Sequence, residues 1–419
     1  MMVRRKYHKS EVFAVWYMWL LCVLFYMYQY VARSAFPNVL KDEYASYFNL
    51  DMYGVSKLIA SYYLIYTLIQ IPSGLLLDRF GARRCAGYAT LVCALGVLLF
   101  VVTQYSAVAT VGQMLIGAGS AFALISTFKL INEWFPPSQI AAMTSLTLAI
   151  GVGGPIVFGP LVGWLKEHVS WLSMFYVFVV IGAILAAAIL ISVREARCII
   201  VATDIASGVR AVFGSLKIIL SNCQIWMLFF YTMMMYAPMS VVTDCWGASY
   251  LQSLYGIEIT EAVFINNMAY IGFCAGIIFF TWLLYKMRSY KKPSVLASFL
   301  SVFSLSCVLF LCDVPVFVMS VYLILMGFSV GGILAFAMVS EMLDASLCAT
   351  ASAWINMGSM LSGVILQPVV GYVLSTRGAA QCYSVADYRV ALCIVLGCVV
   401  CAMCLSWCIK DVIPGENVR

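Results

Sequence analysis

The sequence predicts an all-α integral membrane protein with twelve transmembrane helices arranged as two six-helix bundles. The chain of 419 residues is 64% apolar and only 10% charged, whereas soluble domains usually carry about 25% charged residues. Apolar stretches of the roughly 20 residues that a membrane crossing needs recur along the whole chain. The longest polar segment, residues 194–222, falls at the middle and separates six such stretches from six others.

The apolar stretches define the expected helices, because only helices and closed barrels satisfy every backbone group inside a bilayer. We predict the crossings at residues 13–36, 54–77, 86–104, 107–133, 140–164, 171–193, 224–246, 261–285, 294–312, 315–340, 350–374 and 389–409. The expected organisation is a tail, a first bundle, a linker, a second bundle and a second tail, at residues 1–12, 13–193, 194–222, 223–409 and 410–419.

The basic residues predict the orientation of the chain. The N-terminal tail and every second loop after it collect most of the 24 lysines and arginines, which indicates that these segments and both termini face the cytoplasm. The opposite loops keep Lys41, Lys166, Arg377 and Arg389. The linker mixes Arg210 and Lys217 with apolar residues between 205 and 220, as expected of an amphipathic helix at the inner membrane surface. The first apolar stretch is too long for a signal peptide and reads as a retained crossing.

The composition excludes several other classes of protein. The net charge of +6 is scattered over short loops, so we expect no nucleic-acid partner. His8 and His168 are the two histidines, and the cysteines lie mostly inside apolar runs, so we expect neither metal nor cofactor, nor a membrane-embedded enzyme. A phosphate-binding Gly-x-x-x-x-Gly-Lys-Ser/Thr loop is absent from the sequence, which argues against an ATP-driven pump.

The loop after the second predicted crossing carries the strongest motif. Residues 74–84 read G-L-L-L-D-R-F-G-A-R-R. They match the pattern G-x-L-x-D-R-x-G-x-R-R at every defined position, so the chain resembles the major facilitator superfamily of transporters. We expect Gly74 and Gly81 to permit a tight turn and close helix approach, and Asp78 to accept from amides at a neighbouring helix N-terminus. The resemblance implies that this loop gates transport through Gly74, Asp78, Arg79, Gly81, Arg83 and Arg84.

Weaker patterns refine the resemblance. Residues 285–292 occupy the place of the same loop in the second half and keep only its basic charge. Residues 113–121 resemble a fourth-helix pattern of the superfamily, with Gln113 where an arginine is usual, which speaks against proton-driven antiport. The patches 129–137 and 356–371 look like a prokaryotic branch that includes intraphagosomal amino-acid transporters, and more distantly like lysosomal dipeptide carriers.

Arg33 is the leading candidate for substrate binding. Tyr26, Gln29, Tyr30 and Arg33 are spaced i, i+3, i+4 and i+7, which places them on one face of the first helix. A charge inside a crossing costs at least about 2.5–3.5 kcal/mol, so a helix that keeps one is expected to turn it toward a polar cavity. The alternative is an arginine that reaches up to the outer membrane interface.

The position of Arg33 also resembles that of an arginine in organophosphate antiporters. Those carriers have a basic residue in the seventh helix and a lysine in the second, whereas the seventh crossing here has no basic residue and position 70 is Gln70. A phosphate dianion favours two or more cations, and one guanidinium suits one carboxylate. We therefore expect an amino acid, a small peptide or a monocarboxylate as substrate.

Further polar residues inside the predicted crossings are candidates for the same pore, with interhelical hydrogen bonding as the alternative role of each. They are Tyr66, Gln70, Asn266, Asn356 and Gln367. Asp244 and Glu341 are candidates for coupling to an ion; Asp244 could instead lie at the outer interface and Glu341 at the inner gate.

Together these patterns predict a secondary active or facilitative transporter, a symporter or uniporter that works by alternating access in the cell's inner membrane. We expect a monomer surrounded by lipid that binds a small polar, carboxylate-bearing metabolite, with protons or another ion as a candidate co-substrate. Drug or metabolite efflux is the alternative, favoured by the Met233–Met235 run, and organophosphate transport is another. A transport-inactive receptor of the same fold is a further alternative.

Overall fold

The structure is a computed structural model that describes residues 9–194, 214, 216–311, 313–329, 331–343, 345–377 and 383–412. Most of the segment predicted to be an amphipathic linker helix, and most of both predicted tails, lie outside these described residues.

The first half of the chain forms a bundle of helices that run back and forth along its length. Its elements are α1 (Lys9–Tyr30), the π-helix η1 (Val31–Ala35), α2 (Phe36–Phe48), α3 (Met52–Val101), α4 (Ser106–Ser120), α5 (Ala123–Trp134), α6 (Pro137–His168) and α7 (Trp171–Ser192).

The second half repeats this pattern of elements, including a π-helix in its first helix. Its elements are α9 (Cys223–Ala237), the π-helix η2 (Pro238–Trp246), α10 (Gly247–Tyr255), α11 (Ile259–Met287), α12 (Lys291–Phe310), α13 (Val316–Phe328), α14 (Ile333–Met342), α15 (Ala345–Arg377) and α16 (Val385–Cys408).

Within the described residues, eleven helices are long and apolar enough to cross a membrane. One of them, α3, has 50 residues, a length of about 75 Å that far exceeds the roughly 30 Å of a bilayer core. It is broken at Gly81, whose φ of 79° and ψ of 167° are non-helical. The two arms of α3 therefore supply the separate crossings predicted at 54–77 and 86–104, which gives six crossings in each half.

The first helix of each half is longer than the sequence predicted. The first crossing extends over Phe13–Phe48 and the seventh over Cys223–Tyr255, whereas the predicted crossings ended at residues 36 and 246. The first prediction was too short because Asn38 and Lys41 interrupt the apolar run, whereas Asp244 lies within the seventh crossing as predicted. All three residues are buried in the structure, so these polar positions lie inside the bundle.

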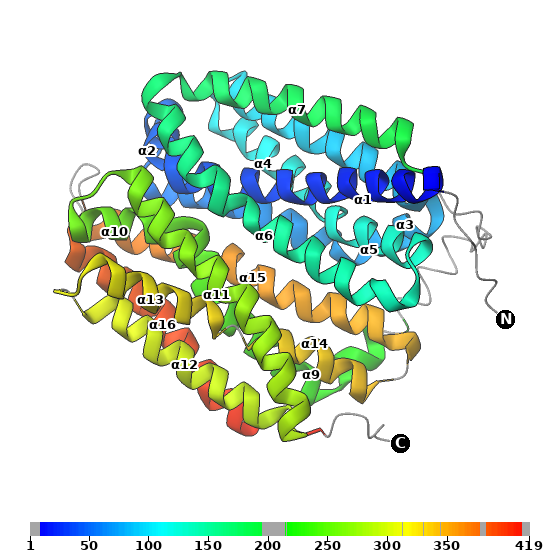
Figure 1. Ribbon diagram of the computed structural model, residues 1–419. Coiled ribbons are helices and arrows are strands. Elements are labelled where there is room, and N and C mark those ends of the chain that lie inside the picture. The colour runs from blue at the N-terminus through cyan, green and yellow to red at the C-terminus, as the bar shows by residue number, and fades with distance from the viewer. Residues whose placement is uncertain are drawn as a thin grey trace.

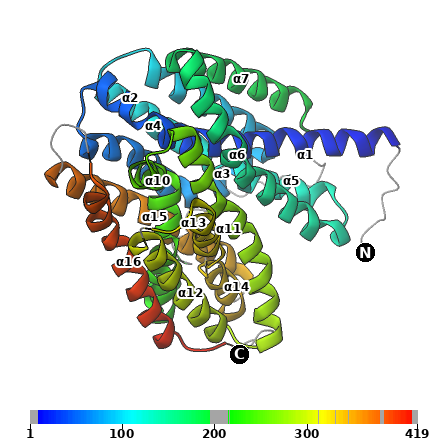
Figure 2. The same ribbon diagram turned by 60° about the vertical axis from the view of Figure 1, so that its left-hand side comes forward.

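The two halves lie side by side as separate groups of helices, α1–α7 and α9–α16 (Figures 1 and 2). The described chain ends lie toward one end of the bundle, which we call the terminal end. The opposite end is formed by α2 and α10, and we call it the distal end (Figure 1). Gly81 lies in a loop at the terminal end, since α3 turns back there after one crossing.

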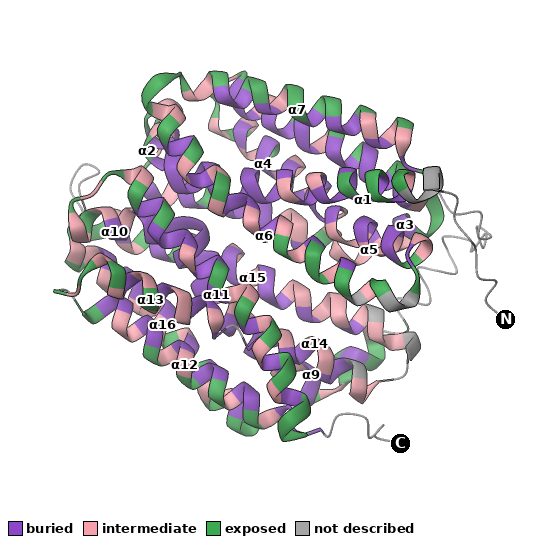
Figure 3. Cartoon of the chain, in the orientation of Figure 1, coloured by how far each residue is buried: buried purple, intermediate pink, exposed green. Residues whose placement is uncertain are grey.

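Buried residues lie on the helix faces that are turned toward other helices (Figure 3). The faces between helices are buried, whereas large apolar side chains such as Ile184, Ile278 and Phe317 are exposed on the outer faces. An apolar belt of this kind is expected where a protein contacts lipid, because exposed apolar patches of this extent are unusual in soluble monomers.

Helices of the two halves pack closely against each other at two places. Helix α3 packs on α15 and α6 packs on α11. A β-carbon at Gly371 of α15 would overlap the Ser56 hydroxyl oxygen, and one at Gly159 of α6 would lie 2.6 Å from Asn267 Nδ2. The absence of a side chain at these two glycines permits the close approach of the helices at these points.

Candidate functional site

Two π-helices bring opposite charges together between the halves. Arg33 lies in η1 and Asp244 in η2, and the two segments occupy the same place in the first helix of their respective halves. A π-turn inserts one residue into the helical register and is often found at functional sites. Here the two π-turns, which contact each other, place a guanidinium opposite a carboxylate.

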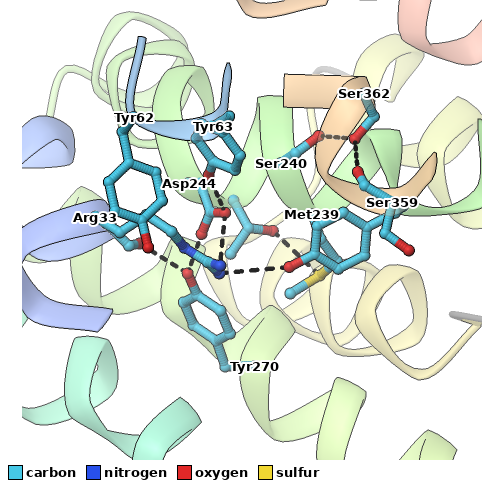
Figure 4. Close-up of polar contacts among 12 residues, drawn as sticks. Arg33, Tyr62, Tyr63, Met239, Ser240, Asp244, Tyr270, Ser359 and Ser362 are labelled. Atoms are coloured by element: carbon cyan, nitrogen blue, oxygen red, sulfur yellow. Dashed lines mark hydrogen bonds and ion pairs between the residues drawn. The ribbon is translucent and has the colours of Figure 1, made fainter. Parts of the chain in front are cut away.

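Arg33 and Asp244 form an ion pair across the interface of the halves (Figure 4). Arg33 Nη2 lies 3.4 Å from Asp244 Oδ2, and the two side chains are only 3% and 1% exposed. Both side chains therefore point into the protein and toward each other. Breaking a buried pair by removing one partner usually costs about 3–5 kcal/mol, since the remaining charge stays buried.

Hydroxyl groups from both halves surround the Asp244 carboxylate (Figure 4). Tyr63 of α3 donates to Oδ2 at 2.7 Å, and Tyr270 of α11 donates to Oδ1. The Tyr270 hydroxyl is also 2.7 Å from Ser34 Oγ of η1. These contacts distribute the hydrogen bonds of one carboxylate over three helices and hold the two halves together at this level.

The Arg33 guanidinium has weaker partners than the carboxylate. Its Nη2 donates to the Tyr236 hydroxyl at 3.4 Å, and its Nε has no hydrogen-bond partner. The rings of Tyr30 and Tyr63 lie 4.3 and 5.7 Å from the guanidinium carbon. Because a guanidinium offers five N–H donors, Arg33 retains donors that a further carboxylate could use.

The other predicted residues of the first half lie near Arg33 in different roles. Gln29 is buried and accepts from Tyr62 at 2.7 Å, and Tyr26 packs edge-to-face on Tyr30. Tyr66 is half-buried and stacks on Tyr62. Gln70, one helical turn further, is also half-buried, and its Oε1 has no hydrogen-bond partner.

The predicted residues of the second half differ in their contacts, and one of them, Asn356, forms a side-chain hydrogen bond with Tyr66 of the first half. Asn266 donates to Thr243 O at 2.8 Å, and Gln367 donates to Ser240 O at 2.6 Å, so both hold the π-helix η2 in place. Asn356 of α15 and Glu341 of α14 are half-buried. The structure does not place Glu341 in the cluster of contacts around Arg33 and Asp244.

The signature loop lies at the terminal end and differs in two respects from its predicted contacts. Asp78 accepts from Lys129 Nζ of α5 at 3.0 Å, so its described partner is an ammonium group, whereas a helix N-terminus was predicted. A β-carbon at Gly74 would meet nothing within 4 Å, so the predicted close helix approach there is wrong. Gly81 forms the predicted tight turn, with a positive φ that other residues rarely adopt.

The arginines of this loop bind the first half to itself. Arg83 Nε donates to Leu190 O of α7 at 2.5 Å, and Arg79 lies over the Phe80 ring. Arg84 lines an apolar cavity of about 480 Å³ between α3 and α4. The loop therefore stabilises one half at the terminal end.

Sequence reasoning missed several residues of the site: Ser34, Asn38, Lys41, Tyr63, Tyr236 and Tyr270. Ser34, Asn38 and Lys41 follow Arg33 along the first helix at helical spacing from one another. This pattern was missed because the first crossing was predicted to end at residue 36. Among the described residues, no group of three or more His, Cys, Asp or Glu side chains could hold a metal ion.

Comparison with known proteins agrees with this architecture. The family model for the Major Facilitator Superfamily matches residues 18–368. The probable galactarate/D-glucarate transporter GudP of Escherichia coli is 21% identical over 407 residues, covering 86% of this chain and 88% of its own. GudP of Bacillus subtilis is 22% identical, covering 83% of each chain.

Solved structures show the same fold. The nucleoside transporter NupG superposes with a TM-score of 0.75 at 14% identity, covering 94% of this chain and 99% of its own. A bacterial homologue of the human lysosomal transporter Spinster superposes with a TM-score of 0.75 at 13% identity, covering 94% and 97%. The chain, a membrane-spanning transporter and not an enzyme, belongs to the Major Facilitator Superfamily.

Proposed function

We propose that the chain moves a small carboxylate-bearing metabolite across the membrane by alternating access, with Arg33 binding the carboxylate between the two halves. The observation that carries this proposal is a buried guanidinium at the interface of the halves whose Nε has no hydrogen-bond partner. Its contacts with Asp244 and Tyr236 are both 3.4 Å long, so a carboxylate could replace them with shorter, charge-assisted bonds.

The charges around Arg33 favour a substrate with one carboxylate. Asp244 already balances the guanidinium, and the remaining described contacts of Arg33 are tyrosines. An amino acid or a small peptide fits this site best, because its ammonium group can pair with Asp244 while its carboxylate binds Arg33; a monocarboxylate would leave the Asp244 charge to be neutralised by a proton. The GudP relatives are named for two dicarboxylic sugar acids, and organophosphates carry two charges, so both classes would require a further cation.

Substrate binding would also change the contact between the halves. Asp244 and a substrate carboxylate would compete for the same guanidinium, and Asp244 belongs to the second half whereas Arg33 belongs to the first. A ligand that displaces Asp244 weakens one of the contacts that hold the halves together. Such a ligand would bind the state with separated halves more tightly than the state with joined halves, and this difference in affinity is what shifts the population between the two states. Asp244 is thus our first candidate for coupling, ahead of Glu341.

A ligand screen by thermal shift tests the proposal on the purified protein. Amino acids, dipeptides, monocarboxylates and galactarate are each added to the wild type, because a ligand at 100 times its Kd adds about 2.7 kcal/mol of stability. We expect stabilisation by a ligand with one carboxylate. Arg33→Ala should abolish it, and Arg33→Lys should not restore it, since lysine offers a point charge without the bidentate fork.

The matched control is Arg377→Ala, because Arg377 is an exposed arginine at the end of α15. It should keep the wild-type response. A ligand that stabilises Arg33→Ala as much as wild type would show that Arg33 does not bind the carboxylate.

We further propose an inner-membrane location, a monomeric state, and an orientation with the terminal end in the cytoplasm. The distribution of basic residues supports the orientation. A membrane-impermeant label applied from outside should reach a probe next to Lys166 but not one next to Arg84; the reverse pattern would overturn the orientation.

A further inference from the structure

The π-helix η2 changes which backbone groups bond to each other near Asp244. In an α-helix the Gly247 N–H would bond to Thr243 O, four residues earlier. Here it bonds to Val242 O, five residues earlier. The Thr243 carbonyl is thereby left to other donors.

Two side-chain amides bond to the Thr243 carbonyl, one from each half. Asn38 Nδ2 of α2 donates at 2.8 Å, and Asn266 Nδ2 of α11 also donates at 2.8 Å. Both asparagines are buried. The bond from Asn38 crosses the interface at the distal end, so the register of η2 is linked to a contact between the halves.

Lys41 makes a second contact of this kind, three residues after Asn38. Its ammonium group donates to Cys245 O and lies 4.6 Å from the centre of the Trp246 ring. The lysine is only 3% exposed, although the sequence predicted that it lies in an outer loop. A buried ammonium is costly unless it is well paired, so a position that keeps one in contact with a carbonyl and an indole ring calls for a functional explanation.

We propose that Asn38 and Lys41 form a latch, hereafter the distal latch, that holds the distal end closed by binding the Thr243 and Cys245 carbonyls of η2. The proposal concerns gating residues separate from the substrate contact of Arg33. The latch releases when η2 returns to the α-helical register.

The latch and the α-helical register exclude each other for a geometric reason. If the Gly247 N–H moves to Thr243 O, it competes with Asn38 and Asn266 for the two lone pairs of that oxygen. Removal of the extra residue from the π-turn also rotates the chain on one side of it by about 100° relative to the other, the angle of one residue in an α-helix. That rotation turns Cys245 O and Trp246 away from Lys41. The element therefore has two discrete states, of which one bridges the halves and the other does not.

The native Cys245 thiol reports the state of the latch. Cys245 is fully buried beside Lys41, whereas Cys223 is exposed at the terminal end. The full-length protein in nanodiscs is labelled with a polar maleimide, and mass spectrometry gives the labelling rate of Cys245 relative to Cys223. We expect Lys41→Met to raise this ratio about tenfold and Asn38→Val to raise it several-fold, since each removes a buried hydrogen bond.

Two comparisons separate a latch from mere packing. Lys166→Met removes a half-buried lysine at the same end whose partner Glu43, 2.6 Å away, belongs to the same half, so it should leave the ratio unchanged. Lys41→Arg retains a donor and should give a ratio between those of wild type and Lys41→Met. If Lys41 only fills space, methionine replaces it at no loss, because apolar substitutes for buried charges are often neutral or stabilising.

An unchanged ratio in both Lys41→Met and Asn38→Val would overturn the proposal. So would an equal rise in Lys166→Met, or a rise of Cys245 and Cys223 labelling together, since either result would indicate general loosening of the protein.

Discussion

The two ends of the bundle are held by different kinds of contact. At the distal end, buried side chains of α2 bind backbone carbonyls of the opposite half, as in the bonds from Asn38 and Lys41. At the terminal end, Lys129 and Arg83 bind groups of their own half. Opening the distal end therefore requires the loss of buried contacts between the halves, whereas these terminal contacts survive a separation of the halves.

The difference in burial predicts a difference in energy. The side chain of Asp78 is 78% exposed, and exposed ion pairs are usually worth about 0–1 kcal/mol. The side chain of Asp244 is 1% exposed, so loss of its partner leaves a buried charge. Substitutions of equal chemistry at Asp78 and at Asp244 should therefore differ in their effect on stability by several kcal/mol.

The largest effect is expected from Asp244→Ala. It leaves the Arg33 charge buried without a carboxylate and should lower the free energy of unfolding by about 3–5 kcal/mol. The double variant Arg33→Met/Asp244→Asn should recover most of that loss, because both charges are removed together. Reversible unfolding in detergent mixtures measures wild type, Asp244→Ala and the double variant, and a double variant that is no more stable than Asp244→Ala would contradict the pairing.

A smaller effect is expected at the backbone of the terminal end. Gly81→Ala places a β-carbon at a φ of 79° and ψ of 167°, a region that side chains rarely occupy, and should cost about 1–3 kcal/mol. Gly74→Ala is the matched control in the same motif, because nothing lies within 4 Å of the added carbon. Equal stabilities of the two variants in the same unfolding assay would show that the break in α3 is not fixed by Gly81.

The smallest effect on stability is expected from Asp78→Asn. It should change the free energy of unfolding by less than about 1 kcal/mol, since the ion pair with Lys129 is exposed. Uptake of the ligand found in the screen should nevertheless fall strongly, as the signature motif implies, and Lys129→Met should show the same defect. Wild-type uptake by Asp78→Asn would reduce the loop to a basic connection between two helices.

The crossings and the signature loop could be predicted because their signals are local. A run of apolar residues shows in the sequence wherever it occurs, and the pattern of residues 74–84 lies within one loop. Arg33 could also be identified from the sequence, because Tyr26 and Tyr30 precede it at helical spacing.

The partners of Arg33 could not be predicted in the same way. Asp244 is separated from it by half of the chain, and nothing local indicates that two π-turns place them face to face. Lys41 was assigned to an outer loop because a polar residue after an apolar run usually ends a crossing; in the structure a contact with the other half buries it instead. Contacts between the halves depend on packing that one sequence does not reveal.

The most direct test of the account is the binding of the best ligand and of its amide to wild type and to Arg33→Ala, measured by titration calorimetry. If Arg33 binds a carboxylate, wild type should prefer the carboxylate form by a hundredfold or more, on the order of the 3–5 kcal/mol expected for a buried charged partner. Arg33→Ala should bind the two forms with equal affinity. An unchanged preference in Arg33→Ala would contradict the claim that this guanidinium between the halves recognises the substrate.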